Sequence, residues 1–229
     1  MRIHRIAARE TNCYLLWGRH GVVLIDPGPP GSTPAIIAGA AEAGVTPGEV
    51  CLILVTHGHL DHYGAAAEVK AWCGAPVAAY PGEPEFSQDR RNALPPAQTL
   101  RGSVIRWFYL LVSPLTRFAP LEADLLLEDK ADLMAYGVEA WTVHLPGPSP
   151  GSIGLTTADG DLFVGDLFVN YIVPSQPLYL SDAEAWQRSY ERIQELRPRM
   201  LYVGHGEPFP GTDLDHLYPA RYQFRWWVR

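Results

Sequence analysis

A histidine-rich run dominates the chemistry that this sequence can support. Residues 57–62 read His-Gly-His-Leu-Asp-His, which places three imidazoles and one carboxylate within six positions. Such side chains are ligands that suit zinc, iron or manganese. We expect His57, His59 and Asp61 to project to one side of an extended loop, after which His62 begins a helix. The run is therefore predicted to present ligands to one metal ion or to two adjacent ones.

Two further polar positions end apolar, strand-like stretches. Asp166 follows residues 161–165, and His205 stands between two glycines after residues 200–203. Each is ambiguous by itself, because an aspartate at a turn is common and a lone histidine has many roles. Catalytic side chains gather on loops at the ends of rigid elements. We therefore expect Asp166 and His205 to join the histidine run.

Alternating strand and helix patterns must position these side chains. Short apolar stretches bounded by glycine and proline predict strands at residues 12–17, 22–26, 51–55, 77–80, 137–144, 153–157, 161–165 and 200–203. Helical spacing predicts helices at residues 33–43, 63–73 and 182–196. Gly74 and Asp182 are suitable as a C-cap and an N-cap for two of these helices.

The order of these motifs resembles the metallo-β-lactamase superfamily. The likeness extends from about Asn12 to Glu207 and is carried by Asp26-Pro27-Gly28, His57-x-His59-x-Asp61-His62, Pro146 to Ser152, Gly165-Asp166 and Gly204-His205-Gly206. It implies an α+β fold, namely an αββα sandwich in which two sheets pack face to face with helices outside. It also implies a metal cluster at one edge of that sandwich.

The resemblance further implies a set of metal ligands, which are His57, His59, Asp61, His62, Asp166 and His205. One metal ion would be bound by the first two histidines together with a third one. The other ion would be bound by Asp61, His62 and His205, and Asp166 would bridge the pair. Zinc is the expected metal, with one or two ions per chain, and iron or manganese are alternatives. Thr56 and Asp26 are expected to orient ligands.

The sequence departs from the family pattern at one ligand. Pro148 stands where the resemblance implies the third histidine, and proline offers no side-chain donor atom. We therefore expect one well-held metal ion at the second set and a weak or empty site beside it. The loop around Pro148 is expected to be exposed and to keep its usual path, with Pro148 pointing toward the first site.

The resemblance implies metal-dependent hydrolysis. A bound metal ion lowers the pKa of water toward about 7, and Asp61 is the expected catalytic residue that accepts or orients the proton of that water. A small ester, thioester or lactone is the expected substrate. A glutathione thioester is not expected, because only 24 residues follow His205. A weakly active or non-enzymatic metal-binding protein and a phosphodiesterase or nuclease are the alternatives.

An inserted segment around residues 81–120 interrupts the alternation of strands and helices. Its later part, residues 104–112, is almost wholly apolar. We favour a buried helix that covers one side of the core. The alternative is that Trp107, Phe108 and Leu111 border a substrate entrance or a subunit contact.

Composition bounds the remaining expectations. With 229 residues, 47% hydrophobic and 19% charged, the chain suits a single globular domain over residues 1–229. A net charge of -7 argues against nucleic acid as a partner. We expect a small-molecule substrate, no membrane partner and a homodimer as an option. Three cysteines that fit no disulfide framework, with no signal sequence, predict a cytoplasmic protein.

Overall fold

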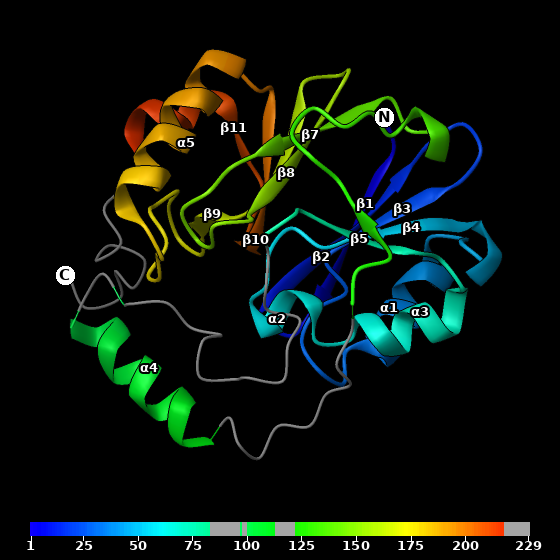
Figure 1. Cartoon of the computed structure of the whole chain (residues 1–229), viewed down its shortest axis with the longest axis horizontal. Coiled ribbons are helices and arrows are strands. Elements are labelled where there is room, and N and C mark those ends of the chain that lie inside the picture. Colours follow the sequence, from blue (N-terminus) through cyan, green and yellow to red (C-terminus); the bar gives the residue numbers. More distant parts are fainter. Residues whose placement is uncertain (83–96, 98–99, 113–121, 218–229) are drawn as a thin grey trace.

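Two β-sheets lie face to face between layers of helices in the computed structural model, which describes residues 1–82, 97, 100–112 and 122–217 (Figure 1). The first sheet has the strand order β1-β2-β3-β4-β5-β6. Its strands are β1 (Ile3–Ala8), β2 (Thr11–Trp17), β3 (Val22–Ile25), β4 (Val50–Leu54), β5 (Val77–Ala79) and β6 (Leu125–Leu126). The pairs from β3 to β6 are parallel, so the carboxyl ends of these strands share one edge of the sheet.

The second sheet has the strand order β11-β10-β9-β8-β7. Its strands are β7 (Ala140–His144), β8 (Ile153–Thr157), β9 (Asp161–Asn170), β10 (Met200–Gly206) and β11 (Phe209–Pro210). Strands β9 and β10 are parallel, whereas their other neighbours are antiparallel. The described helices are α1 (Thr33–Glu42), α2 (Leu60–Tyr63), α3 (Ala66–Cys73), α4 (Leu100–Val112) and α5 (Ala183–Leu196), with short 3-10 turns at Pro47–Glu49, Met134–Tyr136 and Gly211–His216.

Side-chain alternation along the strands builds the layers. In β2, Cys13 and Leu15 pack with the helices outside the first sheet, whereas Tyr14 and Leu16 pack between the two sheets. Strand β9 does the same for the second sheet, because Phe163 faces the first sheet while its neighbours pack toward α5. Both faces of each sheet are therefore buried, as the strand period of two requires. The predicted αββα sandwich is confirmed.

The strand and helix predictions differ from the structure in particular places. The helix predicted at residues 63–73 is two helices, α2 and α3, separated at Gly64 and Ala65. Strand β1 was not predicted; it is an edge strand whose outer side chains are partly exposed and polar, so its apolar pattern is weak. Asp182 caps α5 as predicted, because its carboxylate accepts hydrogen bonds from the backbone of Glu184 and Ala185.

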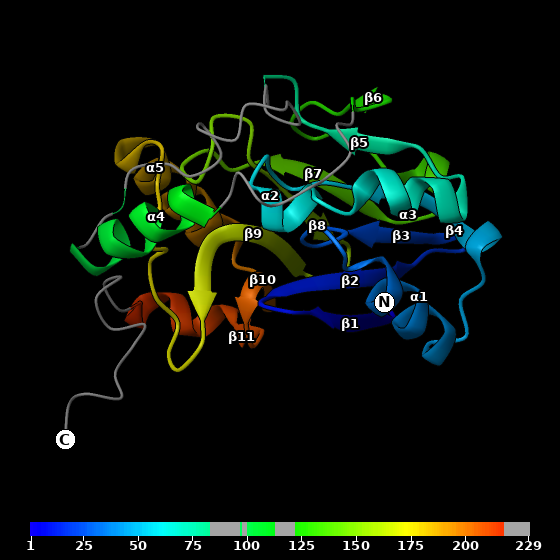
Figure 2. The same cartoon turned by 90° about the horizontal axis from the view of Figure 1, so that it is seen from below.

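Helix α4 does not cover the core, so the favoured interpretation of a buried helix is wrong for its described side chains. Trp107 is 67% exposed and Leu111 is 61% exposed. Figures 1 and 2 show α4 at the outside of the molecule, beyond both sheets. The side chain of Phe108 lies outside the described part of the structure. No helix among the described residues is long and apolar enough to span a membrane.

Candidate metal centre

The histidine run leaves the carboxyl end of β4 and turns directly into α2. His59 is the N-cap of α2 and has an extended backbone, whereas Asp61 and His62 lie within the helical turn. The expectation that Asp61 projects from an extended loop is therefore wrong. The helical turn instead carries Asp61 and His62 around toward the second sheet, while His57 and His59 remain on the β4 side.

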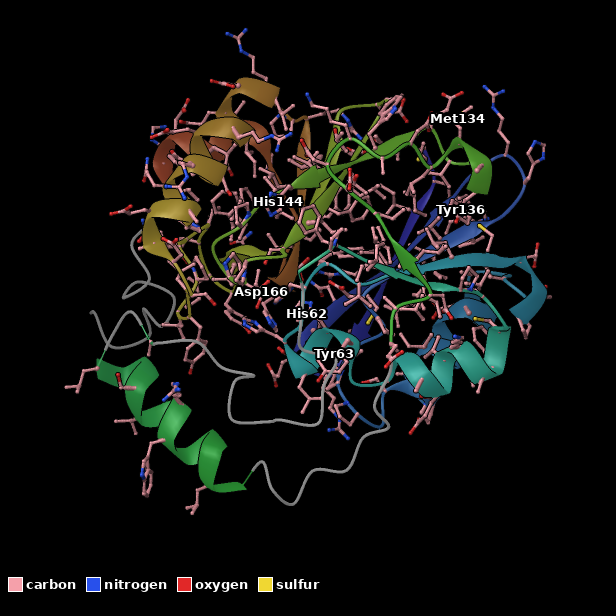
Figure 3. The ribbon with its side chains drawn as sticks, viewed as in Figure 1. His62, Tyr63, Met134, Tyr136, His144 and Asp166 are labelled. Carbon is pink, nitrogen blue, oxygen red and sulfur yellow. The ribbon has the colours of Figure 1, made fainter. Side chains whose placement is uncertain are left out.

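Asp166 lies within β9, not at the end of a strand as predicted. The pairing of β9 with β10 loses its register around this point, since Val203 pairs with Gly165 and His205 pairs with Val169. More residues of β9 than of β10 occupy this interval, which is the geometry of a β-bulge. The bulge lets the side chain of Asp166 leave the normal alternation of the strand. Figure 3 shows Asp166 beside His62 at the edge between the two sheets.

Four donors converge on one point between α2, β9 and β10. His62 Nε2 lies 3.1 Å from Asp166 Oδ1, and His205 Nε2 lies 3.4 Å from the same oxygen. Asp61 Oδ2 lies 3.1 Å from His205 Nε2 and 3.9 Å from His62 Nε2. Ligand atoms around a tetrahedral zinc ion with bonds of about 2.0–2.1 Å are about 3.3 Å apart. These four donors match that spacing.

A second cluster adjoins the first and shares Asp166. His57 Nε2 lies 2.8 Å from His59 Nδ1. The other carboxylate oxygen of Asp166, Oδ2, lies 3.6 Å from His57 Nε2 and 3.7 Å from His59 Nδ1. This half of the centre therefore brings together three donors, and Asp166 stands between the two halves as the resemblance implied.

The loop that carries Pro148 is fastened to its surroundings. Pro148 is buried, which corrects the expectation of an exposed position. Its carbonyl accepts a hydrogen bond from Ser181 Oγ at 2.7 Å, and the neighbouring Gly147 carbonyl accepts one from the Ser181 N–H at 2.8 Å. A residue placed at 148 must therefore fit a packed environment, and its direction relative to the first site stays a prediction.

Asp26 organises both halves from behind. Its carboxylate accepts hydrogen bonds from the backbone N–H and the hydroxyl of Thr56, each at 2.8 Å, and from His62 Nδ1 at 2.8 Å. The Thr56 hydroxyl in turn lies 3.0 Å from His57 Nδ1. These contacts leave Nε2 of His57 and His62 facing the centre. Asp26 adopts a left-handed backbone with φ of 53°, a strained conformation that aspartate tolerates better than most residues.

His205 is oriented from the first sheet. Its Nδ1 lies 2.7 Å from the carbonyl oxygen of Glu10, which must accept the proton, so Nε2 faces the carboxylates. Glu10 lies in the turn between β1 and β2, and no sequence signal pointed to it because the contact uses its backbone. Tyr171, just after β9, stacks near the His205 ring at 6.1 Å between centroids and was also not predicted.

Two glycines allow the strands to approach this closely. A Cβ atom at Gly204 would lie 2.5 Å from Asp166 Oδ1 and 2.5 Å from His62 Cε1, inside the cluster itself. A Cβ atom at Gly165 would lie 2.7 Å from Thr56 Oγ1, and Gly165 also has a φ of 52°. Glycine is therefore required beside each of the two strand ligands.

The cluster strongly shifts the ionisation of its members. Burial would lower the pKa of His62, but Asp166, Asp26 and Asp61 outweigh burial and raise that pKa from 6.5 to about 10. Burial together with the neighbouring His62 and His59 lowers the pKa of His57 to about 4. Burial would raise the pKa of Asp61, yet the neighbouring His62 and His205 hold it below its usual range. Without a metal ion, protons on His62 and His205 thus neutralise the carboxylates.

Two buried atoms indicate that a cation belongs at this position. His62 Nε2 and Asp166 Oδ1 are buried without a hydrogen-bond partner. Leaving such atoms unpaired is costly, and native structures normally satisfy them with protein, water or an ion. Two groups of described residues can hold a metal ion, namely His57 with His62 and Asp166, and Asp61 with His62 and His205. The donors present therefore fit a metal ion.

A two-sheet sandwich with histidine and carboxylate donors at one edge is the architecture of a class of metal-dependent hydrolases. The sequence profile of the metallo-beta-lactamase superfamily matches residues 6–205 of this chain. The chain therefore belongs to the metallo-β-lactamase superfamily and is a metallo-hydrolase. Its members bind divalent metal ions, in agreement with the two groups of donors.

Individual relatives extend over most of the chain. It is 29% identical to the probable metallo-hydrolase YqgX of Bacillus subtilis (strain 168), over 90% of this chain and 88% of YqgX. It is 26% identical to the probable metallo-hydrolase YflN of the same organism, over 92% of this chain and 86% of YflN. It is 28% identical to the hydroxyacylglutathione hydrolase GloC of Haemophilus influenzae, over 71% of this chain and 68% of GloC.

Solved structures show the same fold. The metallo-β-lactamase family protein TTHA1429 of Thermus thermophilus superposes with a TM-score of 0.71 at 23% identity, covering 94% of this chain and 77% of that protein. TTHA1623, solved in a di-iron-bound form, superposes with a TM-score of 0.61 at 24% identity, covering 88% of this chain and 90% of that protein. Both likenesses support the αββα fold.

Proposed function

We propose that this metallo-hydrolase cleaves a small carboxylic ester, thioester or lactone at a metal ion bound by Asp61, His62, Asp166 and His205. The observation that carries the proposal is the pair of buried, unpartnered atoms, His62 Nε2 and Asp166 Oδ1, which lie 3.1 Å apart. A cation between these donors would satisfy both. Zinc is the proposed metal, because three or four nitrogen and oxygen donors at tetrahedral spacing suit it.

The chain's own residues supply the arrangement that hydrolysis needs. When bound, the metal ion would lower the pKa of a water molecule and polarise the carbonyl under attack. Asp61 is the proposed catalytic residue; its side chain is 42% exposed, so it can reach a water molecule at the mouth of the centre. Its pKa lies below the usual range, so it is ionised at neutral pH and accepts a hydrogen bond. That low pKa favours orienting the water over fully removing its proton.

His57 and His59 have the second role in this proposal. They share Asp166 with the tighter cluster and lack a third histidine because of Pro148. We propose that they hold a second metal ion weakly and that the protein works with one tightly bound ion. The relative GloC is named as a hydroxyacylglutathione hydrolase, and that name favours a thioester among the three substrate classes.

The test is a substrate panel with the purified, zinc-supplemented protein. The panel contains a p-nitrophenyl ester, a hydroxyacyl glutathione thioester, a γ-lactone and a p-nitrophenyl phosphodiester. We expect turnover of at least one of the first three, loss of that turnover on chelation, and loss in a His205→Ala variant. Turnover of the phosphodiester alone would identify a phosphodiesterase. No turnover by a protein with full metal content would favour a metal-binding protein without hydrolase activity on these classes.

A further inference from the structure

Helix α4 carries a narrow apolar stripe that faces solvent. The stripe consists of Leu100, Val104, Trp107 and Leu111, which are 85%, 61%, 67% and 61% exposed. They are separated by four, three and four residues, so at about 100° per residue they fall within an arc of about 60° on the helix. A large apolar patch on one side of a helix is a typical sign of an interaction surface.

The opposite face of α4 attaches the helix to the body of the protein. Gly102 is buried, and its carbonyl accepts a hydrogen bond from Tyr179 Oη at 3.2 Å. Tyr179 lies in the segment between β9 and α5, and its backbone also pairs with Ala97, just before the helix. Gly102 lies on the far side of the helix from the stripe. The stripe therefore points away from both sheets, in agreement with the outer position of α4 (Figures 1 and 2).

The charge of the sequence around α4 differs from that of the rest of the chain. Residues 90–121 and 217–229 contain no aspartate, glutamate or lysine, yet together they hold eight arginines. The remaining sequence carries ten of the 18 basic residues and all 25 acidic ones. The second segment also contains Trp226 and Trp227. An acidic protein thus concentrates arginine and aromatic residues in the sequence that surrounds its exposed apolar helix and in its last residues.

We propose that α4 docks the protein onto an anionic membrane surface. The apolar stripe would enter the boundary between headgroups and acyl chains, and the arginines of the same segment would contact lipid phosphates. With 13 residues, α4 is about 20 Å long, too short to span a hydrocarbon core of about 30 Å, so it lies in the plane of the surface.

Charge favours a membrane over a second copy of the chain. Pairing two α4 helices through their stripes would bring two arginine-rich segments together without an acidic residue in either one. An anionic lipid surface offers the opposite charge instead. The expected absence of a membrane partner rested on the lack of a spanning segment, whereas this proposal concerns surface contact. It depends on α4 alone and is independent of the reaction at the metal centre.

The test is co-sedimentation with vesicles of phosphatidylcholine alone or with about 30 mol% phosphatidylglycerol, at about 0.1 M salt. We expect wild-type protein to bind the anionic vesicles and to be released by higher salt. Trp107→Ser should bind about tenfold more weakly, because it removes the largest side chain of the stripe. Leu126→Ser, which changes a 64% exposed leucine on β6, is the matched control and should bind as the wild type does.

Other results would overturn the proposal. Equal binding by wild type and Trp107→Ser, or no binding to anionic vesicles, would exclude docking through α4. Loss of binding only in a Trp226→Ser, Trp227→Ser double variant would assign the contact to the last residues. A dimer seen by light scattering that Trp107→Ser dissociates, without vesicle binding, would assign the stripe to a second copy. Thermal unfolding of each variant verifies that it is folded.

Discussion

The two halves of the metal centre differ in how many protein donors surround each one. The half formed by Asp61, His62 and His205 brings together four donors with Asp166, at 3.1–3.9 Å from one another. The half formed by His57 and His59 brings together three, and the position expected for another histidine is Pro148. Each half draws on different elements. A replacement in one loop can therefore weaken one half while the other keeps its donors.

The halves also differ in how their ligands are held from behind. His62 is fixed by the carboxylate of Asp26, and His205 by the carbonyl of Glu10. His57 is held only through the Thr56 hydroxyl, which itself depends on Asp26. Hydrogen bonds to the second ring nitrogen fix the orientation of a histidine ligand and increase its basicity. Direct support from a carboxylate thus again favours the half that contains His62.

Removing a ligand should give the largest contrast between the halves. We expect His205→Ala to weaken zinc binding by more than about a hundredfold, beyond the usual effect of losing a supporting residue. His57→Ala should leave close to one metal ion per chain. The measurement is metal content after dialysis, with zinc titration of each metal-free variant. Equal loss of metal from both variants would remove the proposed asymmetry.

Removing the shared support should have the next largest effect. Asp26→Asn keeps the size of the side chain but removes the charge that faces His62 and Thr56, and we expect zinc affinity to fall by about 10–100-fold. Thr56→Val is the matched comparison, since it breaks the route to His57 but leaves the contact between Asp26 and His62. If Thr56→Val reduces zinc affinity more than Asp26→Asn does, then His62 is not the ligand that matters most.

Metal binding should strengthen as pH rises. The pKa of His62 is raised from 6.5 to about 10 in the metal-free chain, so a metal ion must displace a proton from it at neutral pH. Zinc affinity should increase by up to about tenfold per pH unit between about pH 6.5 and about pH 8. Titrations buffered in that interval test this, and an affinity that does not change with pH would contradict it.

Stability of the metal-free chain should change in the opposite direction. A raised folded-state pKa stabilises the protonated form, so the contribution of His62 is complete below pH 6.5 and is lost as the pH rises through about 10. Denaturant unfolding in the presence of a chelator measures it. His62→Ala, which lacks the titrating group, is the control.

Restoring the missing ligand should give the smallest effect on the tight half. We expect Pro148→His to raise bound metal toward two ions per chain and to leave the affinity of the first ion nearly unchanged. Position 148 is buried, so the variant should also lose some stability, on the order of 1 kcal/mol. Metal content and thermal unfolding measure the two effects. A wild-type chain that already holds two ions at full occupancy would show that another group replaces the histidine.

Local sequence predicted much of the architecture because the strands alternate cleanly. Tyr14 and Leu16 of β2 alternate with Cys13 and Leu15, and this period of two is visible without any structure. The cap of α5 at Asp182 was equally local. By contrast, β6 and β11 have two residues each and exist only through pairing with neighbours, so no pattern of their own could indicate them.

The sequence by itself determined that histidines and carboxylates of this chain could bind metal, because the types and spacing of residues 57–62 are a local property. It also determined that Pro148 offers no donor. Only the tertiary structure decided that Asp166 reaches the centre from a bulge inside β9 and that the Glu10 carbonyl orients His205. It also decided that the apolar residues of α4 face solvent. These features depend on strand register and on contacts between residues far apart in the chain, which no local pattern records.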